Sequence, residues 1–455
     1  MDESQSAARA APAGSAAAAA AAAPAASAAS AAAAATVAAG RPPLQSLAEA
    51  LARLQAGAAA HRLGETETVS TFDALGRVLA ADVVSAIDVP PADNTSMDGY
   101  ALRAADVTAA GTVLPVAQRI PAGVVGQPLA PGSAARIFTG GQLPPGADAV
   151  VMQEQCEAIA DATGSGLGQV RINARPEAGQ WVRRRGEDVM RDAVVLAAGT
   201  RLTPQALGLA ASVGAATLVV CRRPRVAVFS TGDELVMPGE PLKPGAIYNS
   251  NRFTLRGLLQ AAGCEAVDLG IVPDRLDATR AALREAAAQA DLILSSGGVS
   301  VGEEDHLKPA VQAEGELALW QVAMKPGKPL AFGHVRRGDG TRALFMGLPG
   351  NPVSSFVTFV LAVAPVLRAM QGLASPAPKA YALRADFDWP RPDRRREFLR
   401  VRRNDRGGLD LFPNQSSGVL TSTVWADGLC DVPAGQPIAA GDTVRFLPLN
   451  ELIGQ

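Results

Sequence analysis

The sequence has few of the residues that build disulfide frameworks or histidine-rich metal sites. Its 455 residues include four cysteines (Cys156, Cys221, Cys264 and Cys430), scattered without a Cys-x-x-Cys pair, and only three histidines. This pattern indicates neither a disulfide framework nor a zinc cluster, and it fits a reducing cytosol. We therefore expect a cytoplasmic protein.

An excess of charge of either sign is also lacking. The formal net charge is −2, the isoelectric point is near 6.0, and aromatic residues make up 4% of the chain. A protein with this balance has no bulk basic field to attract nucleic acid, so we expect no nucleic-acid partner. The length predicts roughly three domains with ample material for buried cores.

Residues 1–43 are mostly alanine, with serine, proline and glycine. They lack the basic and leucine-rich parts of a signal peptide, and alanine is too weakly apolar to make a convincing membrane span. We interpret them as a disordered Ala-rich tail without a catalytic part. No other stretch looks apolar over a length that crosses a bilayer, so we expect no membrane association.

We take the stretch DLILSSGGVSVGEED at 291–305 as the one around which the rest of the chain is organised. Its first residues are typical of a buried strand, and a glycine–serine loop and three acids follow. Glycine lets the backbone approach a ligand, and free N–H groups with serine hydroxyls suit phosphate oxygens. Carboxylates beside an anion need a cation between them, most simply Mg²⁺. Taken alone, a glycine–serine loop after a strand is more often an ordinary βα turn than a ligand site.

Strands alternate with helices from residue 222 onward, with helices expected at 250–263 and 276–290. This spacing predicts a parallel sheet with helices on both faces. Ligands of such sheets bind at the carboxyl ends of the strands, where STGDE, VPD, SSGGVSVGEED and GLPGNPVS would converge. Glu234, Asp274 and Asp305 lie in these loops. Each alone is more simply a helix cap, but three acids at one sheet edge favour a ligand site.

Lys325 and Lys328 flank a Pro-Gly turn between two apolar runs. Two lysines on a rigid turn at the sheet edge suit phosphates, and solvated turn lysines are an equally good interpretation. From Ala377 to the end, short alternating runs with Gly/Pro turns predict a separate small β domain, a barrel. Arg400 and Ser417 are its conspicuous polar positions.

The region before residue 222 mixes helical and extended patterns. We expect an amphipathic helix over 44–61, a second short helix within 71–85 that ends in an extended exit, and a helix over 202–214 that packs on the first one. Val-, Gly- and Pro-rich runs over 107–180 predict a small β-rich domain, so that one domain is inserted into another.

Polar motifs surround that β-rich region. Asp98 lies in NTSMDGY, where an Asx-turn is the simpler interpretation, and Thr139 lies in a loop between strands. Three arginines at 183–185 precede Glu187 and Asp188. They form either a solvated ion-pair patch, the more usual outcome, or a clamp for a phosphate-bearing ligand.

Together these motifs resemble one family. NTSMDGYA, ARIFTGG, RRRGEDV, STGDEL, SSGGVSVGEED, KPGKP and GLPGNPVS occur in the order and at the spacing of the MoeA family, the molybdopterin molybdenumtransferases, from about residue 44 to the C-terminus. The resemblance implies a multidomain α/β fold with a MoaB/Mog-like parallel-sheet domain, an inserted β-rich domain, a helical linker domain and a C-terminal β-barrel. The implied ranges are 44–86 with 180–221 for the linker, 87–179 for the inserted domain, 222–374 for the molybdopterin-binding domain and 375–455 for the barrel.

The same resemblance implies an enzyme that inserts molybdenum from molybdate into adenylylated molybdopterin, with Mg²⁺ as cofactor and AMP as a product. It also implies a homodimer whose site lies between the α/β domain of one subunit and the inserted domain of the other. The adenylyltransferase of the pathway and molybdoenzyme apoproteins are the further expected partners. Anions call for N–H groups, lysines and arginines, and a cation on a phosphoanhydride calls for carboxylates, so the residue chemistry is compatible.

Carried over by motif, the catalytic residues are Asp98, Thr139, Asp188, Glu234, Asp274, Asp305 and Lys325, of which Glu234, Asp274 and Asp305 take the metal. The expected substrate-binding positions are Ser296, Gly297, Gly298, Ser300, Gly302, Lys328, Pro349, Gly350, Pro352, Ser354, Arg400 and Ser417. Asp98 and Asp188 are expected on the molybdate side. Gln321 stands where some members of the family carry a lysine, so a contact made by that lysine is not expected here.

Three other functions compete with this one. The adenylyltransferase step is the nearest, because Mog-type proteins share the α/β domain, but those are mostly single-domain proteins. A receptor-clustering scaffold such as gephyrin would carry a fused second α/β domain, for which the sequence gives no indication. An inactive binding module would have substituted acids, whereas the acids are present here.

Overall fold

The computed structural model describes residues 44–162, 166–299, 306–373 and 378–453. The Ala-rich tail and three predicted site positions, Ser300, Gly302 and Asp305, lie outside these ranges. The elements described below all belong to one compact unit, Ser46–Gln455.

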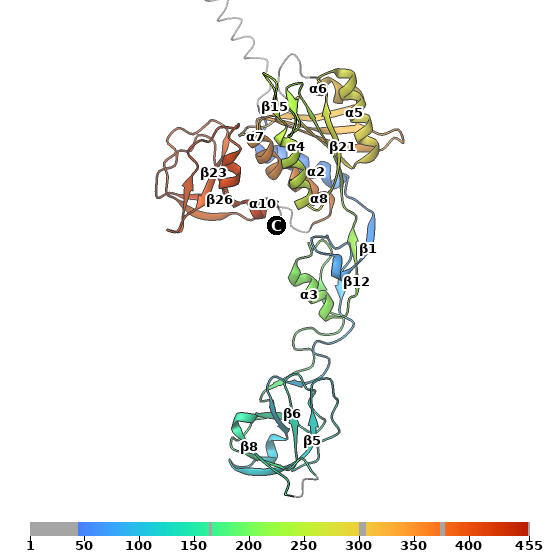
Figure 1. Cartoon of the computed structure of the whole chain (residues 1–455), viewed down its shortest axis with the longest axis vertical. Coiled ribbons are helices and arrows are strands. Elements are labelled where there is room, and N and C mark those ends of the chain that lie inside the picture. The colour runs from blue at the N-terminus through green and yellow to red at the C-terminus, as the bar shows by residue number, and fades with distance from the viewer. Residues whose placement is uncertain (1–43, 163–165, 300–305, 374–377, 454–455) are drawn as a thin grey trace, which may run out of the picture. The chain divides into compact units, whose positions relative to one another are not determined.

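Residues between Arg225 and Leu348 form a six-stranded mixed sheet with helices on both faces (Figure 1). Its strands run in the order β16, β13, β17, β21, β20, β18. The first four are parallel, whereas β20 pairs antiparallel with both β21 and β18. The strand bounds are β16 Glu265–Val272, β13 Arg225–Thr231, β17 Leu292–Ser296, β21 Arg342–Leu348, β20 Pro329–Arg336 and β18 Gly315–Gln321. The prediction of an α/β sheet is confirmed, but the prediction that it is parallel throughout is wrong. Short connections join β18 to β20 and β20 to β21, and these are too short for the crossover that parallel pairing needs.

Alternate residues of β13 show how the two faces are covered. Val226 and Val228 belong to the core under α2, α4, α7 and α8, and Ala227 and Phe229 belong to the core under α5 and α6. This is the period-2 pattern of a strand that is buried on both faces. The helix bounds are α2 Leu47–Ala60, α4 Ser250–Ala261, α5 Leu276–Gln289, α6 Leu307–Glu314, α7 Pro352–Thr358 and α8 Ala364–Met370, with a π-helical turn, η4 Phe359–Val363, between the last two.

Local signals set the ends of α2 and α4. Ser46 and Glu49 form a reciprocal capping box at the start of α2, with Glu49 N donating to Ser46 Oγ at 3.2 Å and Ser46 N donating to Glu49 Oε2 at 3.0 Å. Asn249 Oδ1 accepts Arg252 N at 3.1 Å and begins α4, and Gly263, with φ of 77°, follows its end. Both helices confirm the periodicity of the sequence.

Helix α2 packs beside α8 in the core of the sheet domain, through Leu47 and Leu54. Helix α3 (Pro204–Ser212) instead shares a core with the strands around it, through Ala206 and Ala210. The expectation that these two helices pack on each other is therefore wrong. Their apolar faces are buried in different cores, which periodicity alone does not distinguish.

The helix expected over 71–85 is also wrong. Only the 3₁₀ turn η1 (Thr71–Asp73) forms there, because Gly76 adopts φ of 74° and donates its N–H to Leu202 O at 2.8 Å instead of continuing a helix. The extended exit expected at the end of this segment is confirmed, because Val83 and Val84 pair as a strand. The strands of this region pair antiparallel as β1 (Thr66–Ser70) with β12 (Thr217–Cys221) and β2 (Val83–Val84) with β11 (Val194–Leu196).

An inserted β-rich domain follows, as predicted. Its strands run in the order β7, β4, β6, β5, β9, β8, and the short β3 (Asn94–Thr95) pairs with β10 (Val182–Arg183) beside it. The bounds are β4 Gly99–Leu102, β5 Thr112–Ile120, β6 Ala134–Ile137, β7 Ala149–Met152, β8 Cys156–Ile159 and β9 Gln169–Ile172, with 3₁₀ turns η2 Ala104–Asp106 and η3 Gln153–Gln155.

The C-terminal strands close into a barrel, which confirms that prediction. They run in the order β23, β24, β22, β26, β25, and β25 pairs again with β23. The short β19 (Met324–Lys325) adds to β23 in parallel register and joins the barrel to the turn that carries the predicted lysines. The bounds are β22 Tyr381–Ala385, β23 Arg396–Arg403, β24 Gly408–Leu411, β25 Gly428–Val432 and β26 Thr443–Pro448, with helices α9 Thr421–Trp425 and α10 Leu449–Ile453.

The helical stretch Pro352–Met370 is long and apolar enough to cross a membrane, with a mean hydropathy of 1.8. The expectation that no such stretch exists is therefore wrong. However, 89% of its most apolar window is buried inside the protein, as in the core helix of a soluble protein.

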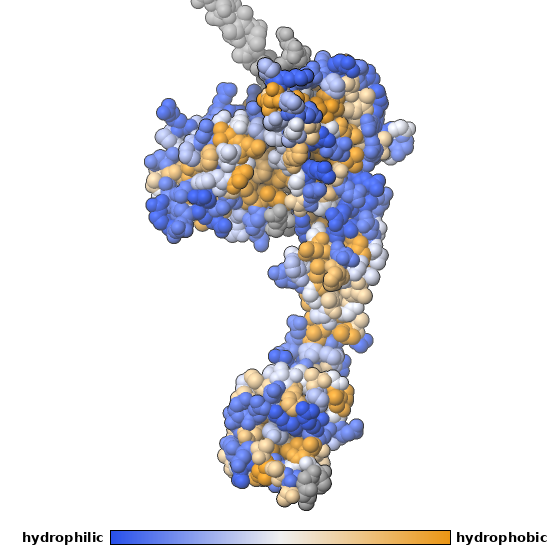
Figure 2. All heavy atoms as spheres, in the orientation of Figure 1, coloured by the Kyte–Doolittle hydropathy of each residue, from blue (hydrophilic) through white to orange (hydrophobic). Residues whose placement is uncertain are grey.

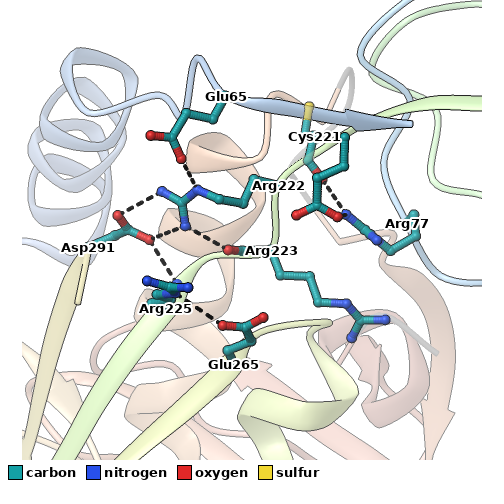
Figure 3. A network of polar contacts seen from close by, with 9 residues as sticks. Glu65, Arg77, Cys221, Arg222, Arg223, Arg225, Glu265 and Asp291 are labelled. Carbon is teal, nitrogen blue, oxygen red and sulfur yellow. Dashed lines mark hydrogen bonds and ion pairs between the residues drawn. The ribbon is translucent and has the colours of Figure 1, made fainter. Parts of the chain in front are cut away.

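Arg222, between β12 and β13, joins the two-stranded pair β1–β12 to the central sheet (Figure 3). Its Nη1 and Nη2 donate to the two oxygens of Asp291 at 3.0 Å each, and its Nε pairs with Glu65. Asp291 Oδ2 also accepts Arg225 N at 2.8 Å. The hydrogen bonds to Asp291 are the main cause of the raised pKa of Arg222. A half-buried bidentate pair of this kind is stronger than an exposed one.

We predict that Asp291→Asn lowers the free energy of unfolding by about 1–3 kcal/mol, because a half-buried guanidinium loses its charged partner. Glu265→Gln, which removes the exposed partner of Arg225, should change it by less than about 0.5 kcal/mol. Differential scanning calorimetry of both variants checks the difference. Equal stabilities would show that the Arg222–Asp291 pair contributes nothing beyond a surface ion pair.

Candidate functional site

A cavity of about 940 Å³ opens at the carboxyl ends of β13, β17 and β21. Its wall is completed by the Lys-Pro-Gly-Lys-Pro turn at 325–329 and by two barrel segments, Arg395 and 415–418. The crevice outside the carboxyl ends of the strands is where open α/β sheets bind ligands.

The cavity brings together predicted site residues that come from separate parts of the chain. Those on its wall are Glu234, Asp274, Ser296, Gly297, Gly298, Lys325, Lys328, Pro349, Gly350, Pro352, Ser354 and Ser417. Asp98, Thr139, Asp188 and Arg400 do not line it in the described part of the chain. The roles of Ser300, Gly302 and Asp305, which lie outside the described residues, stay predictions.

Gly297 makes the close approach of three strand ends possible. Its backbone has φ of 93°, and its N–H donates to Leu348 O at 3.1 Å. A Cβ at this position would lie 2.6 Å from Thr231 O, a backbone atom that cannot move aside easily. Only glycine therefore fits between the ends of β13 and β21.

Asn251, in the first turn of α4, ties two loops of the cavity together. Its Nδ2 donates to Ser296 Oγ at 2.8 Å and to Gly350 O at 2.7 Å. The prediction from sequence missed this residue, although its place at a helix start after a strand is a weak signal of it. Because one amide bonds both loops, the loops after β17 and β21 share one position.

Two buried side chains of the cavity wall keep polar atoms without a hydrogen-bond partner among the described residues. Asn249 Nδ2 and Thr231 Oγ1 are these atoms, and both side chains are almost fully buried. An unpaired buried polar group costs about 1–3 kcal/mol. Such a cost at a cavity is typical of a site where a ligand or water supplies the missing partner.

Carboxylates occupy one part of the cavity wall. Glu234 follows β13 and Asp274 follows β16, and Asp274 N donates to Asp233 Oδ1 at 3.2 Å, which joins their loops. Within the described ranges, no group of three or more His, Cys, Asp or Glu side chains gathers to hold a metal ion. Two carboxylates nevertheless fit Mg²⁺, which is usually held by one or two of them together with phosphates and waters.

Cations occupy another part, and two of them are already paired. Lys325 Nζ lies 2.9 Å from Glu397 Oε1 and 3.5 Å from Asp393 Oδ2. Arg395, which the sequence analysis missed, bonds both oxygens of Asp393 through Nε at 2.9 Å and Nη2 at 3.0 Å. These bonds hold the pKa of Asp393 well below its usual range. Two cations of the cavity wall are therefore held by carboxylates of the barrel that do not themselves line the cavity.

Arg400 lies under the barrel loop and not on the cavity wall. Its side chain is buried and donates to Ser422 Oγ at 3.2 Å, Phe398 O at 3.2 Å and Ser416 O at 3.4 Å. Burial lowers its pKa to about 10. Its position indicates support of the loop, and Ser417 O in that loop accepts Val353 N at 3.0 Å from the start of α7. Direct substrate contact by Arg400 stays a prediction.

In the inserted domain, Asp98 and Thr139 form a pair. Asp98 Oδ1 accepts hydrogen bonds from the backbone N–H and the hydroxyl of Thr139, at 2.7 Å each. The bond from the backbone N–H is the largest cause of the lowered pKa of Asp98, and the bond from the hydroxyl is the second. Asp188 is exposed and is not part of this pair. Two arginines of the 183–185 run do form ion pairs, but with acids other than the expected Glu187 and Asp188: Arg184 pairs with Asp93 at 2.8 Å and Arg185 with Asp88 at 2.5 Å.

The fold and the cavity define a multidomain α/β protein with a large polar cavity, lined by lysines, an arginine and two carboxylates, at a sheet edge. Family models match 45–214 as the MoeA N-terminal region (domain I and II), 227–369 as a probable molybdopterin binding domain and 382–449 as the MoeA C-terminal region (domain IV). The chain belongs to the MoeA family, as its motifs predicted.

Named relatives agree over most of the chain. It is similar to the molybdopterin molybdenumtransferase of Haemophilus influenzae, with 39% identity over 86% of this chain and 95% of that protein, and to that of a Nostoc species, with 37% identity over 85% and 89%. A crystal structure of the molybdopterin biosynthesis MoeA protein from Pyrococcus horikoshii OT3 matches with a TM-score of 0.76 and 28% identity, covering 89% of this chain and 100% of that one.

We predict that Gly297→Ala destabilises the sheet domain by at least about 1–3 kcal/mol, because alanine at this φ is strained and its Cβ meets a carbonyl. Gly257→Ala is the matched control, since a Cβ there has no atom within 4 Å and a helical glycine gains stability on becoming alanine. Thermal unfolding of the two variants measures the difference. Equal melting temperatures would contradict the close approach at Gly297.

Proposed function

We propose that this enzyme transfers molybdenum from molybdate to adenylylated molybdopterin, releases AMP and forms molybdenum cofactor. The observation that carries the proposal is the 39% identity with a molybdopterin molybdenumtransferase over 86% of the chain, together with the cavity described above. In this reaction water adds across the phosphoanhydride, so that AMP leaves and the pterin keeps its own phosphate. The two dithiolene sulfurs replace two oxygens of molybdate, which leave as water with the thiol protons and protons from solvent.

The cavity wall suits the charges of these substrates. Lys325, Lys328 and Arg395 supply cationic donors for phosphate or molybdate oxygens, and the glycine loop at 297–298 lets phosphates reach backbone N–H groups. Asn249 Nδ2 and Thr231 Oγ1 have unused hydrogen-bonding capacity beside them. These groups would bind and orient the substrates, which lowers the barrier by positioning.

Glu234 and Asp274 are the described residues that we propose to hold Mg²⁺, with Asp305 as the third carboxylate of the hypothesis. Bound there, the ion would neutralise charge on the phosphoanhydride as it is cleaved. Asp98, Thr139 and Asp188 are proposed to act from the inserted domain of a second subunit.

Purified protein given adenylylated molybdopterin, molybdate and Mg²⁺ should release AMP in a molybdate-dependent way. Glu234→Gln and Asp274→Asn should each slow AMP release by about 100-fold or more, because the ion loses a ligand at the reacting phosphates. Asp277→Asn, an exposed acid at the start of α5, should leave the rate unchanged.

Absence of molybdate-dependent AMP release would refute the proposed reaction. Release of pyrophosphate from ATP and molybdopterin by the same preparation would point instead to the adenylyltransferase step, which is the nearest alternative.

We also propose that two copies of the chain associate through the region around α3. Large apolar side chains are exposed there, including Phe72 (92% exposed), Leu75, Val84, Val194 and Val219, and Figure 2 shows apolar surface in this region. Exposed patches of this kind usually mark contact surfaces. The buried free thiols at Cys264 and Cys430 suit a reducing compartment, so we place the enzyme in the cytoplasm.

We predict that Phe72→Glu converts a dimer into monomers in sedimentation velocity, because a charge in an apolar interface is not compensated. Val424→Glu, at an equally exposed apolar position of the barrel (86% exposed), should not change the sedimentation coefficient. A wild-type chain that sediments as a monomer, or a Phe72→Glu variant that stays dimeric, would refute this interface.

A further inference from the structure

Glu397 is a buried carboxylate of the barrel that faces a lysine of the cavity. It lies on β23 in register with Lys325 on β19, and only 1% of it is exposed. Its Oε2 accepts Trp389 Nε1 at 3.0 Å and Asp393 N at 2.7 Å, which fixes the carboxylate in place. Its other oxygen, Oε1, lies 2.9 Å from Lys325 Nζ.

The second carboxylate, Asp393, extends this arrangement. Its Oδ2 lies 3.5 Å from Lys325 Nζ, and it bonds Arg395 in a bidentate way. Two cations on the cavity wall, Lys325 and Arg395, therefore have fixed carboxylate partners on the barrel side. Among the cations that line the described cavity, Lys328 has no carboxylate within ion-pair distance in the described chain.

We propose that Glu397 is a positioning residue, which holds Lys325 Nζ at one point of the cavity wall and offsets its charge. This inference rests on the proposed function, in which Lys325 meets an oxyanion. A lysine without such a partner moves among many rotamers, and its ammonium attracts anions wherever it lies. With Glu397 in place, Lys325 Nζ is held at one point, so an oxyanion bound to it takes one position for reaction. The oxyanion also competes with the Glu397 carboxylate for the ammonium, so its affinity is only moderate.

This role predicts effects of opposite sign on binding and turnover. In Glu397→Gln the amide oxygen can still accept the N–H bonds of Trp389 and Asp393, but the negative charge beside Lys325 is gone. Molybdate should then bind about tenfold more tightly, because the competing charge is removed, and turnover should fall about tenfold, because Nζ is no longer positioned. A merely structural role would weaken both.

The experiment is calorimetric titration of the full chain with molybdate, together with single-turnover AMP release. Asp431→Asn is the matched control: it removes another buried carboxylate of the barrel, one that pairs with Arg396 at 2.6 Å and does not line the cavity. It should lower the melting temperature without changing the Kd for molybdate. Asp393→Asn, at the second carboxylate, should shift the molybdate Kd in the same direction as Glu397→Gln, and it serves if Glu397→Gln does not fold.

The double variant tests whether Glu397 acts through the lysine. In a Lys325→Met background, Glu397→Gln should change the molybdate Kd by less than about twofold, since the residue through which it acts is absent. A molybdate Kd that rises in Glu397→Gln, or an effect that persists without Lys325, would overturn the proposal.

The two proposals fail separately because molybdate binding is measured without the pterin substrate. A Glu397→Gln effect on binding in a protein that releases no AMP would refute only the proposed reaction. Molybdate-dependent AMP release with unchanged molybdate affinity in Glu397→Gln would refute only the positioning role.

Discussion

The candidate site depends on the parallel register of β13, β17 and β21, which brings the ends of three strands to one edge of the sheet. Each strand is followed by a loop, and the loops meet only because Gly297 has no side chain to separate them. Asn251 then joins two of them with one amide group. Packing on both faces of the sheet supports this edge, where the cavity is assembled from distant segments.

Positive charge on the cavity wall is partly offset by the barrel. Lys325 and Arg395 line the cavity, and each has a carboxylate of the barrel within ion-pair distance. Lys328, the third cation on the wall, has no carboxylate within ion-pair distance among the described residues, so the barrel offsets part of the positive charge and leaves part of it to a ligand. The barrel is thus more than an appended domain, because it supplies both Arg395 and the carboxylates that restrain Lys325.

The fold and the candidate site were predictable from the sequence where the signal lies in neighbouring residues or in motifs that recur along the chain. The helices at 250–263 and 276–290 follow from apolar periodicity and caps, and the collinear motifs predicted the MoeA family, which the comparisons confirm. The rule for parallel sheets placed the strand-end loops with Glu234, Asp274, Gly297 and Gly350 at one edge, whereas Ser417 of the barrel was predicted only by the family resemblance. The predictions that were wrong concern secondary structure and helix packing that depend on contacts between distant segments. The segment 71–85 has helical periodicity, but Gly76 and pairing with β11 override it, and α2 is buried against α8 and not against α3.

By itself the sequence determined the family, the alternation of strands and helices, and the loops that carry acids, glycines and lysines, because these are encoded in neighbouring residues. Only the tertiary structure decided that Lys325 is paired with Glu397, that Arg400 is buried beneath its loop, and that Asn249 and Thr231 have unpaired polar atoms at the cavity. The physical reason is that the partner and the burial of a side chain depend on which distant segments close around it. That closure is a property of the packed chain and leaves no periodic trace in the sequence.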